Sequence, residues 1–198
     1  ISSKVIADIL HSVAVNHVIT IDLHSAQTQG FFDMTIENIT LENQFAAYIE
    51  KHYKKDSFAI ASPDAGGVKR ARKIADLVHC NDVIIIDKNR YVKNKSKVMN
   101  IIGDPKDKNI IIIDDMIDTA GTICHAAAAL KEKGANHVSV MATHPVFSGN
   151  AYENLSKEDI DKIIVTNTLT IKPELTKVDF IDISEILAEN IYQIFSHK

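Results

Sequence analysis

The sequence predicts an α/β fold, in which helices cover both faces of a parallel β-sheet. One observation is that aliphatic runs such as residues 110–113 are continuous, which is typical of strands buried on both faces. A second is that helical segments alternate with these runs, as in a series of βα units. A third is that polar residues and small-residue turns directly follow several runs, and such sheets bind ligands at that edge.

The helices are predicted from capping and turn residues together with apolar spacing. Ser2 and Ser3 precede apolar residues at helical spacing, which indicates a capped amphipathic helix at the start of the chain. Pro63 and the paired Gly66 and Gly67 end a strand and free the backbone before another helix. An Ala-rich segment begins at Gly121. The expected helices cover residues 2–14, 41–54, 66–79, 121–132 and 185–195.

The strands are predicted from the short aliphatic runs between these helices. A loop is expected to follow the first strand and to extend to about Asn38. A polar loop is also expected between the strands at 83–87 and 99–102. The expected strands cover residues 17–22, 58–62, 83–87, 99–102, 110–114, 137–143, 163–165 and 178–181.

Composition narrows the class of protein. The chain has 198 residues, of which 45% are hydrophobic, enough for one or two domains with their own cores. A net charge of −4 without a dominant basic tract argues against nucleic acid as the main partner, and no apolar stretch is long enough to span a membrane. The two cysteines, Cys80 and Cys124, form no disulfide framework and are expected to be buried free thiols, as in a protein of the reducing cytoplasm.

The segment 110–122 is the most informative part of the sequence. Its aliphatic run ends in Asp114 and Asp115, and a turn of small residues then opens a helix. A helix start offers free N–H groups to an anion, and small residues let a phosphate approach the backbone. The two carboxylates suit sugar hydroxyls or a metal ion. The sequence therefore predicts a sugar phosphate site, with solvated carboxylates on an ordinary turn as the alternative. The predicted phosphate-binding residues are Asp118, Thr119, Ala120, Gly121 and Thr122.

Two further groups of polar residues follow predicted strands. Asp22 and His24 come after the first strand, and imidazole and carboxylate groups can bind a divalent cation directly or through water. The alternative for His24 is a structural residue. Asp64 follows the strand at 58–62 and is predicted to face the ligand edge, with capping of the next helix as its alternative role. The cations at 69, 70, 72 and 73 are expected to be solvated helix residues.

A cationic loop begins directly after the strand at 83–87. It opens with Lys88 and Arg90 and continues with three lysines within residues 91–97. A basic flap beside carboxylates suits a reaction that builds charge on transferring phosphates. A solvated run of charges is the alternative.

Four motifs, in this order along the chain, resemble ribose-phosphate pyrophosphokinases. They are Asp-Leu-His-x-x-Gln-x-x-Gly-Phe-Phe-Asp at 22–33, Ser-Pro-Asp-Ala-Gly-Gly at 62–67, Lys-x-Arg at 88–90, and Asp-Asp-Met-Ile-Asp-Thr-Ala-Gly-Thr at 114–122. The last resembles the phosphoribosyl pyrophosphate loop that type I phosphoribosyltransferases share. That family usually has Gly or Cys where this chain has Ala120, so a slightly altered turn is expected.

The resemblance implies a function for each motif. It implies transfer of diphosphate from ATP to ribose 5-phosphate, which gives phosphoribosyl pyrophosphate and AMP. Lys88 and Arg90 would be catalytic, and Arg90 would also contact substrate. Asp114 and Asp115 would hold the ribose hydroxyls. The Mg site would involve His24, Asp64 and Asp22.

The resemblance also implies an architecture. Residues 1–38 would be the end of a first phosphoribosyltransferase-like domain, and residues 39–198 a second such domain with the ribose 5-phosphate site. Because the chain begins without Met and lacks the family's earlier half, we expect a fragment that is inactive alone. A homo-oligomer of the hexamer-of-dimers type is expected. The alternatives are a non-catalytic regulatory subunit of the same family and a base-using phosphoribosyltransferase.

Overall fold

The structure, a computed structural model, describes residues 1–88, 99–157 and 159–196, with Lys88 and Met99 described by their backbone alone. The chain divides into two compact units, Ile1–Leu41 and Glu42–Lys198. Each unit is described by itself below. No helix in the described part of the chain combines the length and the apolar character that a membrane crossing requires.

The first unit contains helix α1 (Ser2–Ser12), strand β1 (His17–Ile21), the 3-10 helix η1 (Ala26–Phe31) and strand β2 (Thr35–Ile39). β1 and β2 pair in parallel from His17 opposite Thr35 to Ile21 opposite Ile39. The expectation of a loop up to Asn38 is therefore wrong, since this segment holds both η1 and β2.

The second unit is built on one sheet with the strand order β5-β4-β3-β6-β7-β8-β9. All neighbouring pairs are parallel except β4 and β5, so the expected parallel sheet gains an antiparallel edge strand. The strands are β3 (Phe58–Ser62), β4 (Val83–Lys88), β5 (Met99–Ile102), β6 (Asn109–Ile117), β7 (His137–Pro145), β8 (Lys162–Thr166) and β9 (Val178–Ile181). The helices are α2 (Glu42–His52), α3 (Val68–Leu77), α4 (Gly121–Glu132), α5 (Ala151–Leu155) and α6 (Ser184–Ser196).

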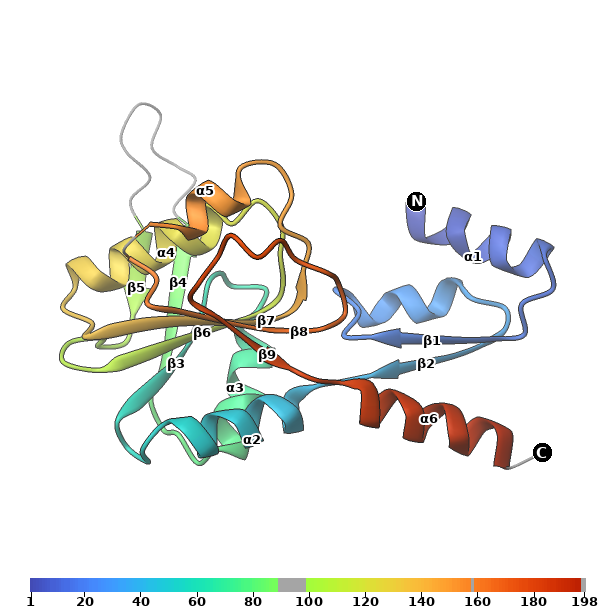
Figure 1. Cartoon of the computed structure of the whole chain (residues 1–198), viewed down its shortest axis with the longest axis horizontal. Coiled ribbons are helices and arrows are strands. Elements are labelled where there is room, and N and C mark those ends of the chain that lie inside the picture. Colours follow the sequence, from blue (N-terminus) through green and yellow to red (C-terminus); the bar gives the residue numbers. More distant parts are fainter. Residues whose placement is uncertain (89–98, 158, 197–198) are drawn as a thin grey trace. The chain divides into compact units, whose positions relative to one another are not determined.

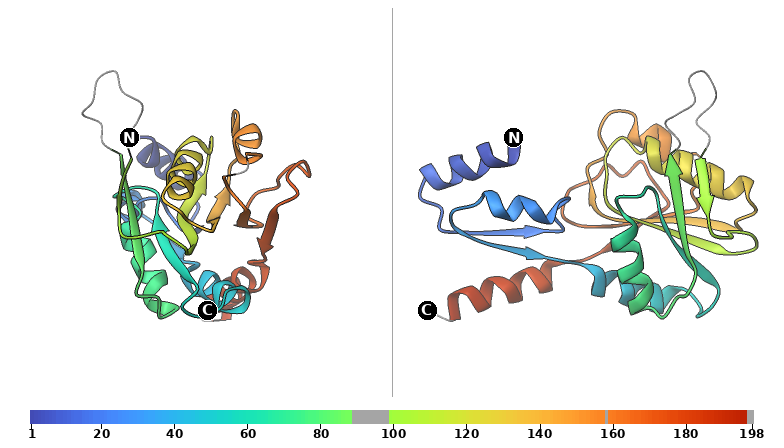
Figure 2. Two further views of the ribbon diagram at one scale, coloured as in Figure 1. Left: turned by 90° about the vertical axis from the view of Figure 1, so that its left-hand side faces the viewer. Right: turned by 180° about the vertical axis from the view of Figure 1, so that it is seen from behind.

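Helices cover both faces of this sheet. In Figure 1, α2 and α3 lie on one face and α4 and α5 on the other, and the reverse view in Figure 2 shows the same layers. All four isoleucines at 110–113 are fully buried, as expected for a strand with helices on both sides. The aliphatic runs of the sequence are thus the core of the second unit.

The order of the strands reverses between β3 and β6. From β3 the chain passes through α3 to β4 on one side, whereas from β6 it passes through α4 to β7 on the other. α3 and α4 lie on opposite faces of the sheet (Figure 1). Such a switch point opens a crevice at the carboxyl ends of the two strands, where α/β sheets bind ligands.

Candidate functional site

Asp114 and Asp115 lie where β6 extends beyond β3. β6 pairs with β3 only as far as Ile112 opposite Ala61, but it continues beside β7 to Ile117 opposite Pro145. The predicted end of the strand at Asp114 is therefore wrong, because β7 supports the extension. The two carboxylates still stand at the switch point, now on a rigid strand rather than in a loop.

Like charges crowd around Asp114. Burial, together with the neighbouring Asp115 and Asp64, raises the pKa of its carboxyl to about 7 against one opposing contact. That contact is the backbone N–H of Asp115, which donates to Asp114 Oδ1 at 2.9 Å. A carboxyl in this state favours a proton, a cation or a hydroxyl donor as its partner.

Arg70 on α3 reaches this edge of the sheet. Its Nη1 lies 3.4 Å from Asp115 Oδ1, and the Asp115 side chain is only 3% exposed. The expectation that Arg70 is a solvated helix residue is therefore wrong. A tertiary contact across two elements carried no signal in the local sequence. The ion pair fixes Asp115 and offsets one of the crowded charges.

Asp64 is held in a compact turn after β3. Ser62 Oγ donates to the Asp64 carbonyl oxygen at 2.6 Å, and the Gly67 N–H donates to Asp64 Oδ1 at 3.0 Å. A Cβ on Gly67 would lie 2.8 Å from Ser62 Oγ, so the turn requires glycine there. Asp64 thus makes the capping contact that was the alternative prediction, and it also lies close enough to raise the pKa of Asp114.

The segment 118–122 forms the turn between β6 and α4. Ala120 precedes the helix in the left-handed conformation, with φ 61° and ψ 0°. The expectation was that alanine at this position would alter the turn slightly. Instead, Ala120 itself adopts the left-handed backbone conformation, which is strained for a residue other than glycine. The carbonyl of Ala120 accepts the N–H of Cys124 at 2.9 Å. The N–H groups of the first helical turn have no carbonyl within the helix, which makes this end suitable for an anion.

The predicted metal residues belong to both units. Asp22 and His24 lie in the first unit, where Asp22 follows β1 with φ 44° and donates its N–H to the Ile39 carbonyl at 2.9 Å. Asp64 lies in the second unit. Within the described residues, no group of three or more His, Cys, Asp or Glu side chains could hold a metal ion.

The predicted catalytic pair, Lys88 and Arg90, lies at the boundary of the residues that the structure describes. Lys88 is the last residue of β4, next to β3 in the sheet. Arg90 and the loop at 91–97 lie outside the described residues.

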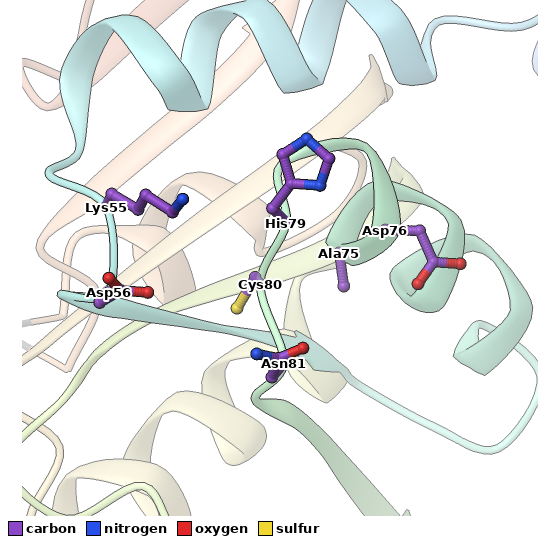
Figure 3. A pocket seen from close by; sticks show the side chains of 7 residues that line it. All are labelled: Lys55, Asp56, Ala75, Asp76, His79, Cys80 and Asn81. Carbon is purple, nitrogen blue, oxygen red and sulfur yellow. The ribbon is translucent and has the colours of Figure 1, made fainter.

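A polar cavity of about 510 Å³ lies at the opposite edge of the sheet. Figure 3 shows its lining, which comes mainly from the turns that precede β3 and β4. It is therefore separate from the carboxylates at the strands' other ends. Cys80 lies here, half-buried and outside any helix, whereas Cys124 is buried in α4 as expected. The residues of the lining are Lys55, Asp56, Ala75, Asp76, His79, Cys80 and Asn81.

Comparison with known proteins agrees with this geometry. The phosphoribosyl synthetase-associated domain matches residues 59–198, which include the whole sheet from the second residue of β3 onward. The chain belongs to this family. The matched residues include the switch point between β3 and β6 and the turn at 118–122.

Similar proteins of known name are ribose-phosphate pyrophosphokinases, also called phosphoribosylpyrophosphate synthetases. A ribose-phosphate pyrophosphokinase from Shewanella oneidensis is 48% identical over all of this chain and 64% of its own length. A crystal structure of phosphoribosylpyrophosphate synthetase from Mycobacterium smegmatis has a TM-score of 0.92 at 34% identity, again over all of this chain and 64% of the other. The chain thus spans slightly less than two thirds of these relatives.

A more distant structure shares the fold. An adenine phosphoribosyltransferase superposes with a TM-score of 0.50 and 16% identity, over 63% of this chain and 76% of that one. The predicted type I phosphoribosyltransferase-like architecture is therefore confirmed.

Proposed function

We propose that the chain forms the ribose 5-phosphate site of a ribose-phosphate pyrophosphokinase. The reaction converts ATP and ribose 5-phosphate into AMP and phosphoribosyl pyrophosphate. One observation carries the proposal: the switch point between β3 and β6 brings Asp64, Asp114 and the turn at 118–122 to the same edge of the sheet. Sugar-binding carboxylates and a phosphate-binding helix start are the two halves of a sugar phosphate site.

Each part of the site has a role in substrate binding. The turn from Asp118 to Thr122 holds the 5-phosphate through backbone N–H groups at the start of the helix and through the Thr122 hydroxyl. Asp114 and Asp115 accept hydrogen bonds from the ribose hydroxyls. Those hydroxyls relieve the charge crowding that raises the pKa of Asp114.

The reaction then depends on position and charge. The anomeric oxygen attacks the β-phosphorus of ATP and loses its proton. The bond between the β-phosphorus and the oxygen of the α-phosphate breaks, and AMP leaves with that electron pair. Lys88 is the last residue of β4, and Arg90 comes two residues later in the sequence. Both side chains neutralise the charge that develops on the transferred group.

A magnesium ion is part of the proposal, and the residues fit it. Mg²⁺ uses one or two carboxylates together with substrate phosphates and water, so the absence of a cluster of three ligands among the described residues does not oppose it. Asp64 presents its carboxylate near Asp114 within the second unit. Asp22 and His24, in the first unit, are candidates on the family resemblance alone. When bound, the ion supplies charge neutralisation at the diphosphate.

Two alternative functions are less well supported. A regulatory subunit has no need of the carboxylates, the turn and Lys88 together, and a base-using phosphoribosyltransferase shares only the motif at 114–122. The names of the relatives favour the pyrophosphokinase. Activity with ATP, compared with activity with purine or pyrimidine bases, separates these functions. A cytoplasmic homo-oligomer remains part of the proposal on the family resemblance.

Calorimetric titration with ribose 5-phosphate tests the site. We expect Asp118→Ala and Thr122→Val each to weaken binding by roughly 1–3 kcal/mol. Thr122→Val removes a hydroxyl donor to the phosphate, and Asp118→Ala removes the charge-assisted hydrogen bond that Ser148 donates to the turn. Thr176→Val, in an exposed turn near β9, is the matched control and should bind as the wild type does. Unchanged affinity in both site variants would remove the sugar phosphate from this turn, and a wild type without affinity would remove it from the chain.

A further inference from the structure

The segment after β7 lies against the turn at 118–122. We call residues 147–155 the brace. The Phe147 N–H donates to the Ile117 carbonyl at 2.9 Å, and the Ser148 N–H donates to the Asp118 carbonyl at 3.1 Å. These backbone bonds join the brace to the point where β6 ends and the turn begins. The helix of the brace, α5, lies beside α4 in Figure 1.

Two side chains of the brace bond the turn itself. Ser148 Oγ donates a short hydrogen bond to Asp118 Oδ1. Asn154 Nδ2 donates to the Thr119 carbonyl at 3.0 Å, while the Asn154 carbonyl accepts the Cys124 thiol at 3.3 Å. Asn154 therefore links the turn to the first part of α4.

The brace is itself fixed by the core. Phe147 is buried with φ 45°, and its ring packs edge-to-face on Tyr152 with centroids 5.6 Å apart. Ala151 and Leu155 are fully buried. Such packing is what a strained neighbour requires, because the left-handed conformation of Ala120 persists only where surrounding contacts determine it.

The carboxylate of Asp118 is the reason why the turn needs the hydrogen bonds of the brace before it can bind an anion. A carboxylate in a phosphate-binding turn repels the phosphate unless its charge is engaged and its direction fixed. The Ser148 hydroxyl does both, and Asn154 holds the adjoining peptide. We propose that Ser148 and Asn154 are positioning residues that shape the turn at 118–122 for phosphate, a proposal that rests on the sugar phosphate site above.

Titrations with ribose 5-phosphate and with inorganic phosphate test this proposal in the 198-residue chain. We expect Ser148→Ala to weaken both ligands by about 5- to 10-fold, since a charge-assisted hydrogen bond is lost. Both ligands should lose the same factor because the phosphate is their shared group. Asn154→Ala should weaken both ligands in the same direction. Ser148→Thr keeps the hydroxyl and should bind within about threefold of the wild type.

A double-mutant cycle separates positioning from a general structural role. In a chain that already carries Asp118→Ala, Ser148→Ala should cost less than about twofold, because the partner of its hydroxyl is gone. Ser156→Ala is the matched control, since its hydroxyl bonds the Tyr152 carbonyl and not the turn; it should bind as the wild type does. Wild-type affinity in both Ser148→Ala and Asn154→Ala, or an additive cycle, would overturn the proposal. A wild type that binds neither ligand would overturn the sugar phosphate site as well.

Discussion

Two carboxylates of the second unit, Asp114 and Asp179, have pKa values shifted in opposite directions. Asp114 lies at the switch point, where burial and neighbouring carboxyls raise its pKa to about 7. Asp179 lies on β9, where Lys162 Nζ at 2.6 Å and the Tyr48 hydroxyl at 2.5 Å lower its pKa. One fold thus leaves one carboxylate crowded and gives another two partners.

The opposite pKa shifts distinguish the proposed sugar phosphate site at Asp114 from a structural ion pair at Asp179. The partners of Asp179 come from α2 and β8, so this cluster ties a helix to the far side of the sheet. Burial, together with the bond to Asp179, raises the pKa of Tyr48 to about 12, which keeps its hydroxyl a donor. At Asp114 the residues that the structure describes contribute one backbone donor, the N–H of Asp115, and a ligand with hydroxyls or a cation would supply further partners.

The largest contrast is expected between two lysines. Under the proposed function, Lys88→Ala should lower turnover by ~10²–10³, because the proposal assigns its positive charge to the transition state. Lys162→Ala should instead lower the free energy of unfolding by up to about 1 kcal/mol and leave turnover unchanged. A coupled assay of AMP release, with urea denaturation of both variants, measures the two effects. Near-normal turnover in Lys88→Ala would make that residue a binding or surface residue.

A smaller effect is expected from the ion pair at the binding edge. Arg70→Ala should lower the free energy of unfolding by about 2 kcal/mol, because Asp115 is almost fully buried and loses its guanidinium partner. Arg72→Ala, an exposed residue of the same helix, is the control and should cost less than about 0.5 kcal/mol. Equal stability of the two variants would show that the contact between Arg70 and Asp115 contributes nothing.

The smallest effect is a difference in pH dependence. Since the pKa of Asp114 rises from 3.8 to about 7 on folding, this group favours the folded state below about pH 4 and loses that contribution as the pH rises through 7. Asp114→Asn stays neutral and still accepts the Asp115 N–H. It should therefore be more stable than the wild type at pH 8 and equal to it near pH 4.

The matched control is Asp179→Asn, for which the expected change in stability at pH 8 is opposite to that of Asp114→Asn. The pKa of Asp179 is lowered on folding, so its ionised form contributes stability at pH 8 that is lost in acid. Asp179→Asn should be less stable than the wild type at pH 8, and the difference should shrink as the pH falls. Urea denaturation at several pH values measures both. A loss of stability in Asp114→Asn at pH 8 would contradict the contrast between the two carboxylates.

The central strands of the second unit could be predicted because burial on both faces leaves continuous apolar runs, as in β3. β3, β5, β9 and α4 have the predicted bounds. α5 was missed because a helix of five residues has too few positions to show a period. β6 was predicted too short because its last residues include acids, and only the neighbouring β7 explains why they remain in a strand.

The candidate site could be predicted in part, for a related reason. Asp64, Asp114 and the turn at 118–122 were predicted because each directly follows or ends an expected strand, and parallel strands end at one edge. Their roles in binding stay predictions. Arg70, Ser148 and Asn154 were missed because their contacts join elements far apart in the sequence. Such contacts depend on tertiary packing, which no local pattern encodes.

The carboxyl of Asp114 has a raised pKa and awaits a ligand at the proposed sugar phosphate site. Titration of Asp114 in solution tests this claim most directly. Carbon-detected NMR of the chain labelled at the aspartate carboxyl carbons, assigned with Asp114→Asn, gives its apparent pKa. We expect a value near 7 in the free chain, and a clearly lower value once ribose 5-phosphate and Mg²⁺ are added, because hydroxyl donors and a cation favour the ionised form. A pKa near 4 in the free chain, or a raised pKa that the ligands leave unchanged, would contradict the account.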